Sequence, residues 1–172
     1  MTDVTIRQAT PADAKAVHGL ITAHLEEGHL LPRTLDDVRR HARRFVVCEA
    51  AGGVVACGEL APLSGKVAEV RSLVVSRDFR RVGLAARLLG ALRDRASQAG
   101  FETLSTFTRD ARFFVRQGFS IVPHVQLPEK IAKDCQCCSL FRQCEQFGLV
   151  LPLAAVPVRA PAPTPTPHVA VA

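Results

Sequence analysis

The stretch Val70–Arg87, with the sequence VRSLVVSRDFRRVGLAAR, decides the fold. Its first six residues form an apolar run typical of a buried strand, and apolar side chains at helical spacing begin at Leu84. A glycine lets the backbone approach an anion, and a helix N-terminus offers unpaired N–H groups and a positive dipole end. We therefore expect a pyrophosphate cradle at the turn formed by Arg80, Arg81, Val82, Gly83, Leu84 and Ala85. The N–H groups from Val82 to Ala85 would hold the anion.

Two common nucleotide motifs, Gly-x-Gly-x-x-Gly and Gly-Lys-Ser/Thr, do not occur in the sequence, which disfavours a nicotinamide or nucleoside triphosphate site. The pattern Arg-x-x-Gly-x-Ala after a strand instead resembles the acetyl-coenzyme A loop of the GNAT family of N-acetyltransferases. This resemblance implies an enzyme with acetyl-CoA as cosubstrate. It also implies that the backbone of Leu73, Val74 and Val75 pairs with the pantetheine arm like an extra strand.

Composition limits the other function classes. The 172 residues suit one domain, and a hydrophobic content of 48% is enough for a core. No apolar run reaches the length of about 18 residues that a membrane span needs, and the N-terminus lacks signal-peptide features. We therefore expect a cytoplasmic location without a membrane partner. The net charge of +6 suits an anionic small molecule, whereas scattered basic residues without Tyr or Trp argue against nucleic acid.

The order of predicted elements indicates an α/β protein with a mixed, mostly antiparallel sheet flanked by helices, as in the GNAT (acyl-CoA N-acyltransferase) fold. Helices are predicted to begin at the N-caps Thr10 and Thr34. Strands are predicted at 4–7, 45–49, 54–60, 70–75, 102–106 and 119–123, and further helices at 82–99 and 111–117. The predicted domain covers residues 1–151 with a Cys-rich segment at 134–144, and a Pro/Ala/Thr-rich tail at 152–172 is expected to be disordered.

Several strings, in shared order and spacing, resemble the short single-domain bacterial form of N-acetylglutamate synthase, an amino-acid N-acetyltransferase. They are Leu31–Arg33, Ala68–Leu73, Phe113–Phe114 before Gly118–Phe119, Leu127–Lys130, and the set Asp134, Cys135, Cys138, Phe141 and Cys144. The resemblance implies acetyl transfer to the α-amine of L-glutamate, the first step of arginine biosynthesis, and a homodimer at family level. The chain has no room for the amino-acid kinase domain of longer synthases, so we expect any feedback to act on the acetyltransferase domain.

Acetyl transfer to an amine needs a base, because an ammonium group must lose a proton before it attacks a thioester. Glu69 is the candidate, because it lies early on the strand that leads to the cofactor loop and its neighbours are apolar. It would act directly or through water. Glu59, on the adjacent strand, is the alternative.

The leaving thiolate benefits from a proton donor, and many GNAT enzymes use a tyrosine. This sequence contains no tyrosine. Ser105 resembles a serine used in some synthases and is the candidate catalytic hydroxyl, with Thr106 as an alternative. A strand hydroxyl with only a local hydrogen bond would explain the same residues.

A dicarboxylate acceptor needs cationic contacts, for which the arginine fork is well matched. Arg33, in a loop between helices, and Arg71 are the candidates, with Lys130 as a third. Because Arg71 is two residues after Glu69, both side chains should emerge on one face of the strand. A polyamine acceptor would favour acidic residues instead.

The six cysteines fall into two groups. Cys48 and Cys57 lie in apolar runs and are predicted core residues. Cys135, Cys137, Cys138 and Cys144 form a cluster in which Cys135, Cys138 and Cys144 have metal-like spacing and Cys137 is an extra thiol. Because zinc normally takes four ligands, no metal is expected and a thiol-rich packing motif is the preferred interpretation. Other functions left open are acetyl transfer to glutamine, another amino acid, a polyamine or a protein lysine, and a non-catalytic thiol- or metal-binding module.

Overall fold

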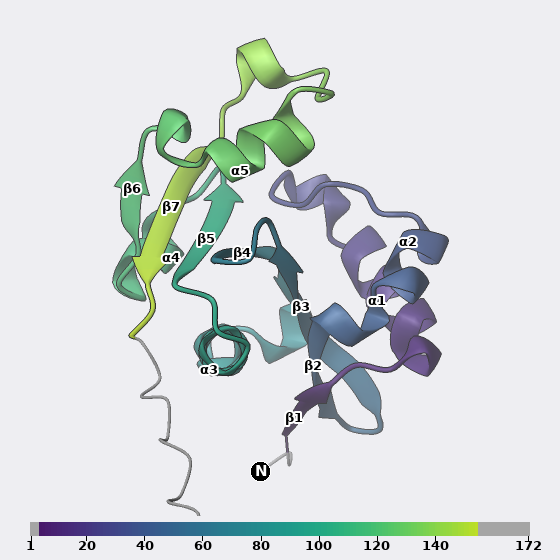
Figure 1. Cartoon of the computed structure of the whole chain (residues 1–172). Coiled ribbons are helices and arrows are strands. Elements are labelled where there is room, and N and C mark those ends of the chain that lie inside the picture. Colours follow the sequence, from purple (N-terminus) through teal and green to yellow (C-terminus); the bar gives the residue numbers. More distant parts are fainter. Residues whose placement is uncertain (1–3, 155–172) are drawn as a thin grey trace, which may run out of the picture.

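A mixed sheet with the strand order β1-β2-β3-β4-β5-β7-β6 forms the centre of the molecule (Figure 1). The computed structural model describes residues 4–154. Its strands are β1 (Thr5–Gln8), β2 (Phe45–Ala50), β3 (Gly53–Pro62), β4 (Val67–Val75), β5 (Thr103–Thr108), β6 (Ser120–Val122) and β7 (Phe147–Pro152). The β4–β5 pair is parallel and the other neighbouring pairs are antiparallel, which confirms the predicted fold class.

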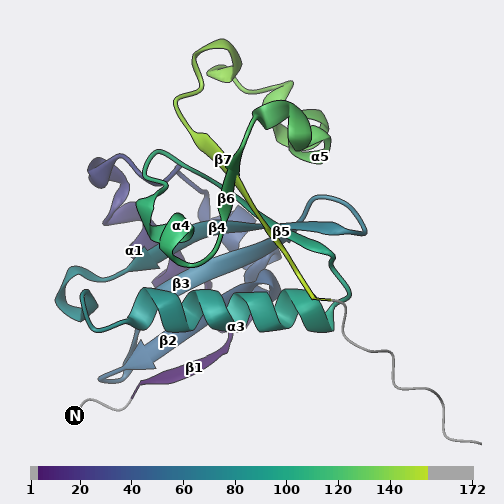
Figure 2. The same ribbon diagram turned by 90° about the vertical axis from the view of Figure 1, so that its left-hand side faces the viewer.

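Helices cover both faces of the sheet. They are α1 (Ala14–Thr22), α2 (Leu35–Arg40), α3 (Leu84–Gln98), α4 (Arg112–Arg116) and the one-turn α5 (Pro128–Lys130), which continues into a π-helical turn at Ile131–Cys135. One core lies beneath α1 and α2 and includes Phe45 and Val47, while the other lies beneath α3 and α4 and includes Val46 and Cys48. This alternation along β2 follows from the period of two in a strand. Figure 2 shows α3 running along the sheet.

The predicted helix starts are present. The Thr34 hydroxyl accepts a hydrogen bond of 3.1 Å from the Asp37 backbone N–H, and the Asp13 carboxylate accepts one of 2.7 Å from the Thr10 backbone N–H. Such contacts satisfy donors that a helix N-terminus leaves unpaired. Local side-chain chemistry therefore places both helix starts where the sequence predicts them.

The strand β7 was not predicted from the sequence. It lies between β5 and β6, and its register pairs Pro152 with Thr103 and Leu149 with Thr106. A six-residue apolar segment gives a weak pattern by itself, and its partner strand is far away along the chain. The predicted tail begins at 152, but Pro152 ends this strand, and residues 155–172 lie outside the described residues.

The parallel strands β4 and β5 are paired only over part of their length. The pairs run from Val67 with Thr103 to Val70 with Thr106, and β4 then continues to Val75 beside β3. The β3–β4 register shifts between Cys57 and Glu59, and Ser72 opposite has a left-handed φ of 49°. A bulge bends a strand and redirects its side chains. The sheet is therefore split between its two halves (Figure 1).

Candidate active site

A cavity of about 810 Å³ lies where β4 and β5 separate. Residues 70–75 of β4 and 106–108 of β5 line its two sides, and residues from the 24–33 loop and from the Cys-rich segment complete it. The second half of β4 has no strand partner on the β5 side among the described residues. Its backbone groups are therefore free to pair with an extended ligand.

The predicted pyrophosphate turn lies beside this cavity and is open. Gly83 is the N-cap of α3 with a φ of 79°, Arg81 has a φ of 65°, and the Val82 side chain is 70% exposed. Within residues 4–154, no partner is found for the backbone N–H groups from Arg81 to Ala86. Unpaired N–H groups at a helix N-terminus form an anion site.

The other predicted donor-site residues fit this geometry. Leu73, Val74, Val75, Arg80 and Ala85 all line the cavity. The Arg80 side chain, however, is held by the protein: its Nε donates to the Val75 carbonyl at 2.9 Å and its Nη2 donates to Glu27 at 2.8 Å. Arg80 thus braces the turn between strand and helix.

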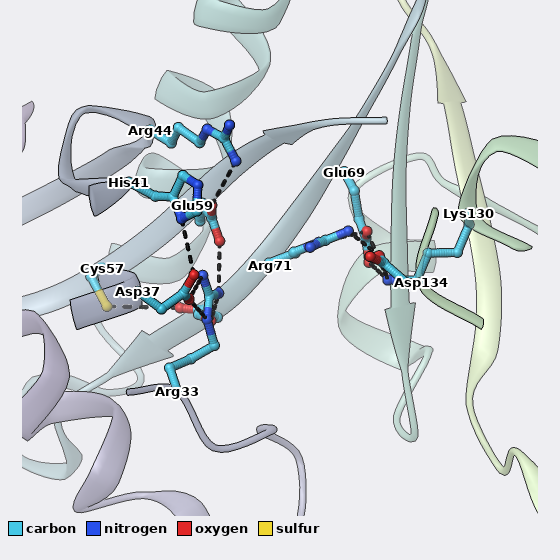
Figure 3. A network of polar contacts seen from close by, with 11 residues as sticks. Arg33, Asp37, His41, Arg44, Cys57, Glu59, Glu69, Arg71, Lys130 and Asp134 are labelled. Atoms are coloured by element: carbon cyan, nitrogen blue, oxygen red, sulfur yellow. Dashed lines mark hydrogen bonds and ion pairs between the residues drawn. The ribbon is translucent and has the colours of Figure 1, made fainter. Parts of the chain in front are cut away.

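Glu69 is 3% exposed and is the centre of one ion-pair cluster, the Glu69 cluster (Figure 3). Arg71 Nε donates to Glu69 at 2.7 Å, and Lys130 Nζ lies 2.9 Å from both Glu69 oxygens. Asp134 accepts hydrogen bonds from Arg71 and, at 2.9 Å, from Lys130. The surroundings of the Glu69 carboxylate are therefore not apolar: Arg71 reaches it from two residues along the same strand, as predicted, and folding brings Lys130 to it from 61 positions away.

The charges in this cluster support each other. Burial alone would lower the pKa of Arg71, but the charges of Glu69 and Asp134 outweigh burial and raise it. Burial alone would raise the pKa of Asp134, but hydrogen bonds and charges from Lys130 and Arg71 lower it. Opposite charges in contact thus favour the ionised forms of Arg71 and Asp134.

A second cluster, the Glu59 cluster, lies across the cavity on β3 and α2 (Figure 3). Glu59 is 1% exposed and accepts a hydrogen bond of 2.7 Å from Arg33 Nη1. Arg33 Nε donates to Asp37 at 2.6 Å, and His41 Nδ1 lies 3.0 Å from the other Asp37 oxygen. Arg44 approaches Glu59 at 3.9 Å.

Ser105 does not reach the cavity. Its side chain is fully buried, and its hydroxyl donates to the Ala68 carbonyl at 3.1 Å. Thr106 lines the cavity, but its hydroxyl donates to the Val70 carbonyl at 3.1 Å. Both hydroxyls therefore tie β5 to β4, and the structure does not support the predicted catalytic role of Ser105.

Cys48 and Cys57 lie in the core as the sequence predicts, but Cys137, Cys138 and Cys144 are exposed, which does not support the predicted thiol-rich packing motif. Cys48 and Cys57 are buried, and burial raises the pKa of the Cys48 thiol to about 11. Cys135, Cys138 and Cys144 line the mouth of the cavity. In the part of the chain that the structure describes, no group of three His, Cys, Asp or Glu side chains is arranged to hold a metal.

Sequence reasoning missed the charged partners that complete both clusters. Asp37, His41 and Arg44 were not singled out, and Asp134 was noted only as part of a resemblance. The spacing of Lys130 and Asp134, four residues apart at the start of a helical segment, was the available signal. Their contact with β4 depends on the tertiary fold.

A split sheet with an open helix start at one end of the cleft and a cluster of charged side chains within it is the arrangement expected of a group-transfer enzyme. Residues 15–119 match the Acetyltransferase (GNAT) family. An uncharacterised N-acetyltransferase from Chlorobaculum tepidum is 30% identical over 151 residues, which cover 88% of this chain and 97% of that protein. The chain belongs to the GNAT family of acetyltransferases, which confirms the predicted enzyme class, an acetyl-CoA-dependent N-acetyltransferase.

Two longer proteins extend the comparison. An amino-acid acetyltransferase from Pseudomonas putida is 33% identical over 117 residues, which cover 67% of this chain and 27% of that protein. The structure of N-acetylglutamate synthase from Neisseria gonorrhoeae, complexed with coenzyme A and N-acetyl-glutamate, has a TM-score of 0.79 at 27% identity. That match covers 90% of this chain and 36% of the synthase. Among the described helices, none has the length and apolar character to cross a membrane.

Proposed function

We propose that this protein transfers the acetyl group of acetyl-CoA to the α-amine of L-glutamate, the N-acetylglutamate synthase reaction that opens arginine biosynthesis. The observation that carries the proposal is the Glu69 cluster, which combines a buried carboxylate with two cations where β4 and β5 separate. The likeness to an amino-acid acetyltransferase and to N-acetylglutamate synthase supports the choice of acceptor.

Glu69 acts as the base in this proposal. Its carboxylate takes a proton from the acceptor ammonium, directly or through water, and the free amine then attacks the acetyl carbonyl. The backbone of 73–75 and the N–H groups at the start of α3 would hold the pantetheine and pyrophosphate of acetyl-CoA, which supplies the acetyl group. The proposal assigns no proton donor for the leaving thiolate, because Ser105 is buried away from the cavity.

Arg71 and Lys130 bind the α-carboxylate in this proposal, because that group is separated from the reacting amine by a single carbon and both cations touch Glu69. Arg33, across the cavity, is the proposed partner of the side-chain carboxylate. Charge-assisted hydrogen bonds to carboxylates are among the strong polar contacts in proteins.

A thiol-release assay with acetyl-CoA and a panel of acceptors tests the proposal. We expect glutamate-dependent release that falls at least about 100-fold in kcat/KM for Arg71→Ala, as for loss of a group that orients substrate. The matched control is Arg39→Ala, because Arg39 pairs with Asp36 on the exposed side of α2. Equal release with lysine or spermidine would overturn the acceptor assignment.

A further inference from the structure

The cations of the cavity are already paired with acids of the protein. Arg33 gives its Nε to Asp37 and its Nη1 to Glu59, and Lys130 contacts both Glu69 and Asp134. An acceptor carboxylate that binds Arg71 and Lys130 must therefore share them with two carboxylates already present. Like charges in contact repel, so either Glu69 or Asp134 has to move away from the two cations when the acceptor carboxylate binds.

Glu69 and Asp134 differ in how firmly the fold holds them. Glu69 lies on β4, is hydrogen-bonded in register with Ala61 on one side and Ser105 on the other, and is 3% exposed. Asp134 lies on the π-helical turn at Ile131–Cys135, its side chain is 32% exposed, and the residues after it to Glu145 are largely exposed. A segment with few buried apolar contacts opens at low cost in free energy.

Asp134 also lies where the acceptor's α-carboxylate is expected to bind. Its carboxylate bridges the two cations that flank the proposed base, where the α-carboxylate of an amino acid would lie when its amine faces Glu69 (Figure 3). We infer that Asp134 is a specificity residue that fills the α-carboxylate subsite and is displaced by the acceptor's own α-carboxylate. This inference rests on the proposed function.

This arrangement would select acceptors that carry an α-carboxylate. An amine without an α-carboxylate, such as a polyamine or a peptide N-terminus, cannot replace Asp134 between Arg71 and Lys130. An amino acid can, but part of its binding free energy is offset by the contacts that Asp134 loses. Removal of the Asp134 charge should therefore strengthen the binding of acceptors that carry an α-carboxylate.

The test compares L-glutamate with L-glutamic acid α-amide (isoglutamine), which lacks the α-carboxylate and keeps the side-chain carboxylate. For Asp134→Asn we expect a KM for glutamate about tenfold lower, with kcat changed by less than about twofold. The weak release expected with isoglutamine should change by less than about twofold in kcat/KM. Asp134→Glu, which keeps the charge, should retain a KM for glutamate near the wild-type value. Asp134→Ala provides a second variant without the carboxylate, and Asp36→Asn, at an exposed site outside the cavity, is the control.

A higher KM for glutamate in Asp134→Asn would mean that Asp134 positions the two cations, and it would overturn the inference. Equal changes for glutamate and isoglutamine would also overturn it. These outcomes leave the proposed function standing, because wild-type turnover with glutamate is measured in the same assay. A wild-type enzyme that acetylates neither amino acid would reject the proposed function and this inference together.

Discussion

Glu59 and Glu69 lie on neighbouring strands, are both almost fully buried, and are both paired with an arginine, yet their surroundings differ. The partners of Glu59 come from the loop just before α2 and from the 3-10 turn after it, and α2 itself is anchored in the core by buried Val38. The Lys130 partner of Glu69 comes from the one-turn α5, and Asp134, on the exposed turn after α5, contacts Arg71 and Lys130. A buried charge can therefore either lock the fold or remain available for chemistry, depending on whether its partners are fixed.

The largest expected effect is a difference in kcat between the variants of Glu69 and Glu59. Glu69→Gln should lower kcat by about 100- to 1000-fold, because a positioned general base contributes in this range. The steady-state rate and its pH profile measure the change, and the profile should lose the limb assigned to the base. Glu102→Gln, at an exposed ion pair with Lys66, is the control. A comparable loss of kcat in Glu59→Gln would remove the distinction between the two residues.

The next effect concerns stability. Glu59→Gln should lower the free energy of unfolding by about 2 kcal/mol, because it leaves half-buried Arg33 with only its Asp37 pair and leaves Arg44 without a carboxylate partner among the described residues. Urea denaturation of the two variants measures the difference. A smaller loss is expected for Glu69→Gln, because Lys130 and Arg71 retain Asp134. The reverse order of the two losses would contradict the comparison.

The double variant Arg33→Met with Glu59→Leu separates the structural role of the Arg33–Glu59 pair from the proposed role of Arg33 in acceptor binding. Well-packed apolar replacements of a buried ion pair are often tolerated, so its free energy of unfolding should stay within about 1 kcal/mol of wild type. The KM for glutamate should still rise, because the proposed partner of the side-chain carboxylate is gone. Stability restored together with an unchanged KM would exclude Arg33 from the acceptor site.

The smallest effect is pH-dependent. Burial alone would raise the pKa of Asp37, but the hydrogen bond and charge of Arg33 lower it. A carboxyl group whose pKa is lower in the folded state than its unfolded-state pKa of about 4 stabilises the fold at higher pH. This stabilisation is lost as the pH falls through the folded-state pKa. Asp37→Asn should therefore cost about 0.5 kcal/mol at pH 7, since Asp37 is partly exposed, and progressively less in acid. Thermal melts of both proteins from pH 7 to pH 3 measure this convergence, and a constant gap would contradict it.

The sequence predicted the elements whose signals are local. The apolar run before Val75, the glycine at 83 and the periodic side chains of α3 lie within one short stretch, and the structure confirms strand, turn and helix there. The two-residue spacing of Glu69 and Arg71 correctly placed both side chains together, because side chains alternate along a strand.

Features that depend on contacts between residues far apart in the chain could not be predicted from the sequence. The strand β7 needs β5 and β6 on either side, and the burial of Ser105 depends on the β4–β5 register. The contact of Asp134 with Arg71 spans 63 positions in the chain. Nothing in the residues near Asp134 indicates which strand it will face.

The sequence by itself determined the class of enzyme and located the proposed donor side of the site, because a strand, a glycine turn and a helix start are adjacent in the chain and together present free backbone N–H groups. Only the tertiary structure decided the acceptor side. There the sheet separates after Val70, and segments from both ends of the chain bring their charges to Glu69 and Glu59. The ion pairs that join these segments exist only once the sheet register is set, since Arg33 and Lys130 are matched to Glu59 and Glu69 by folding and not by proximity in sequence.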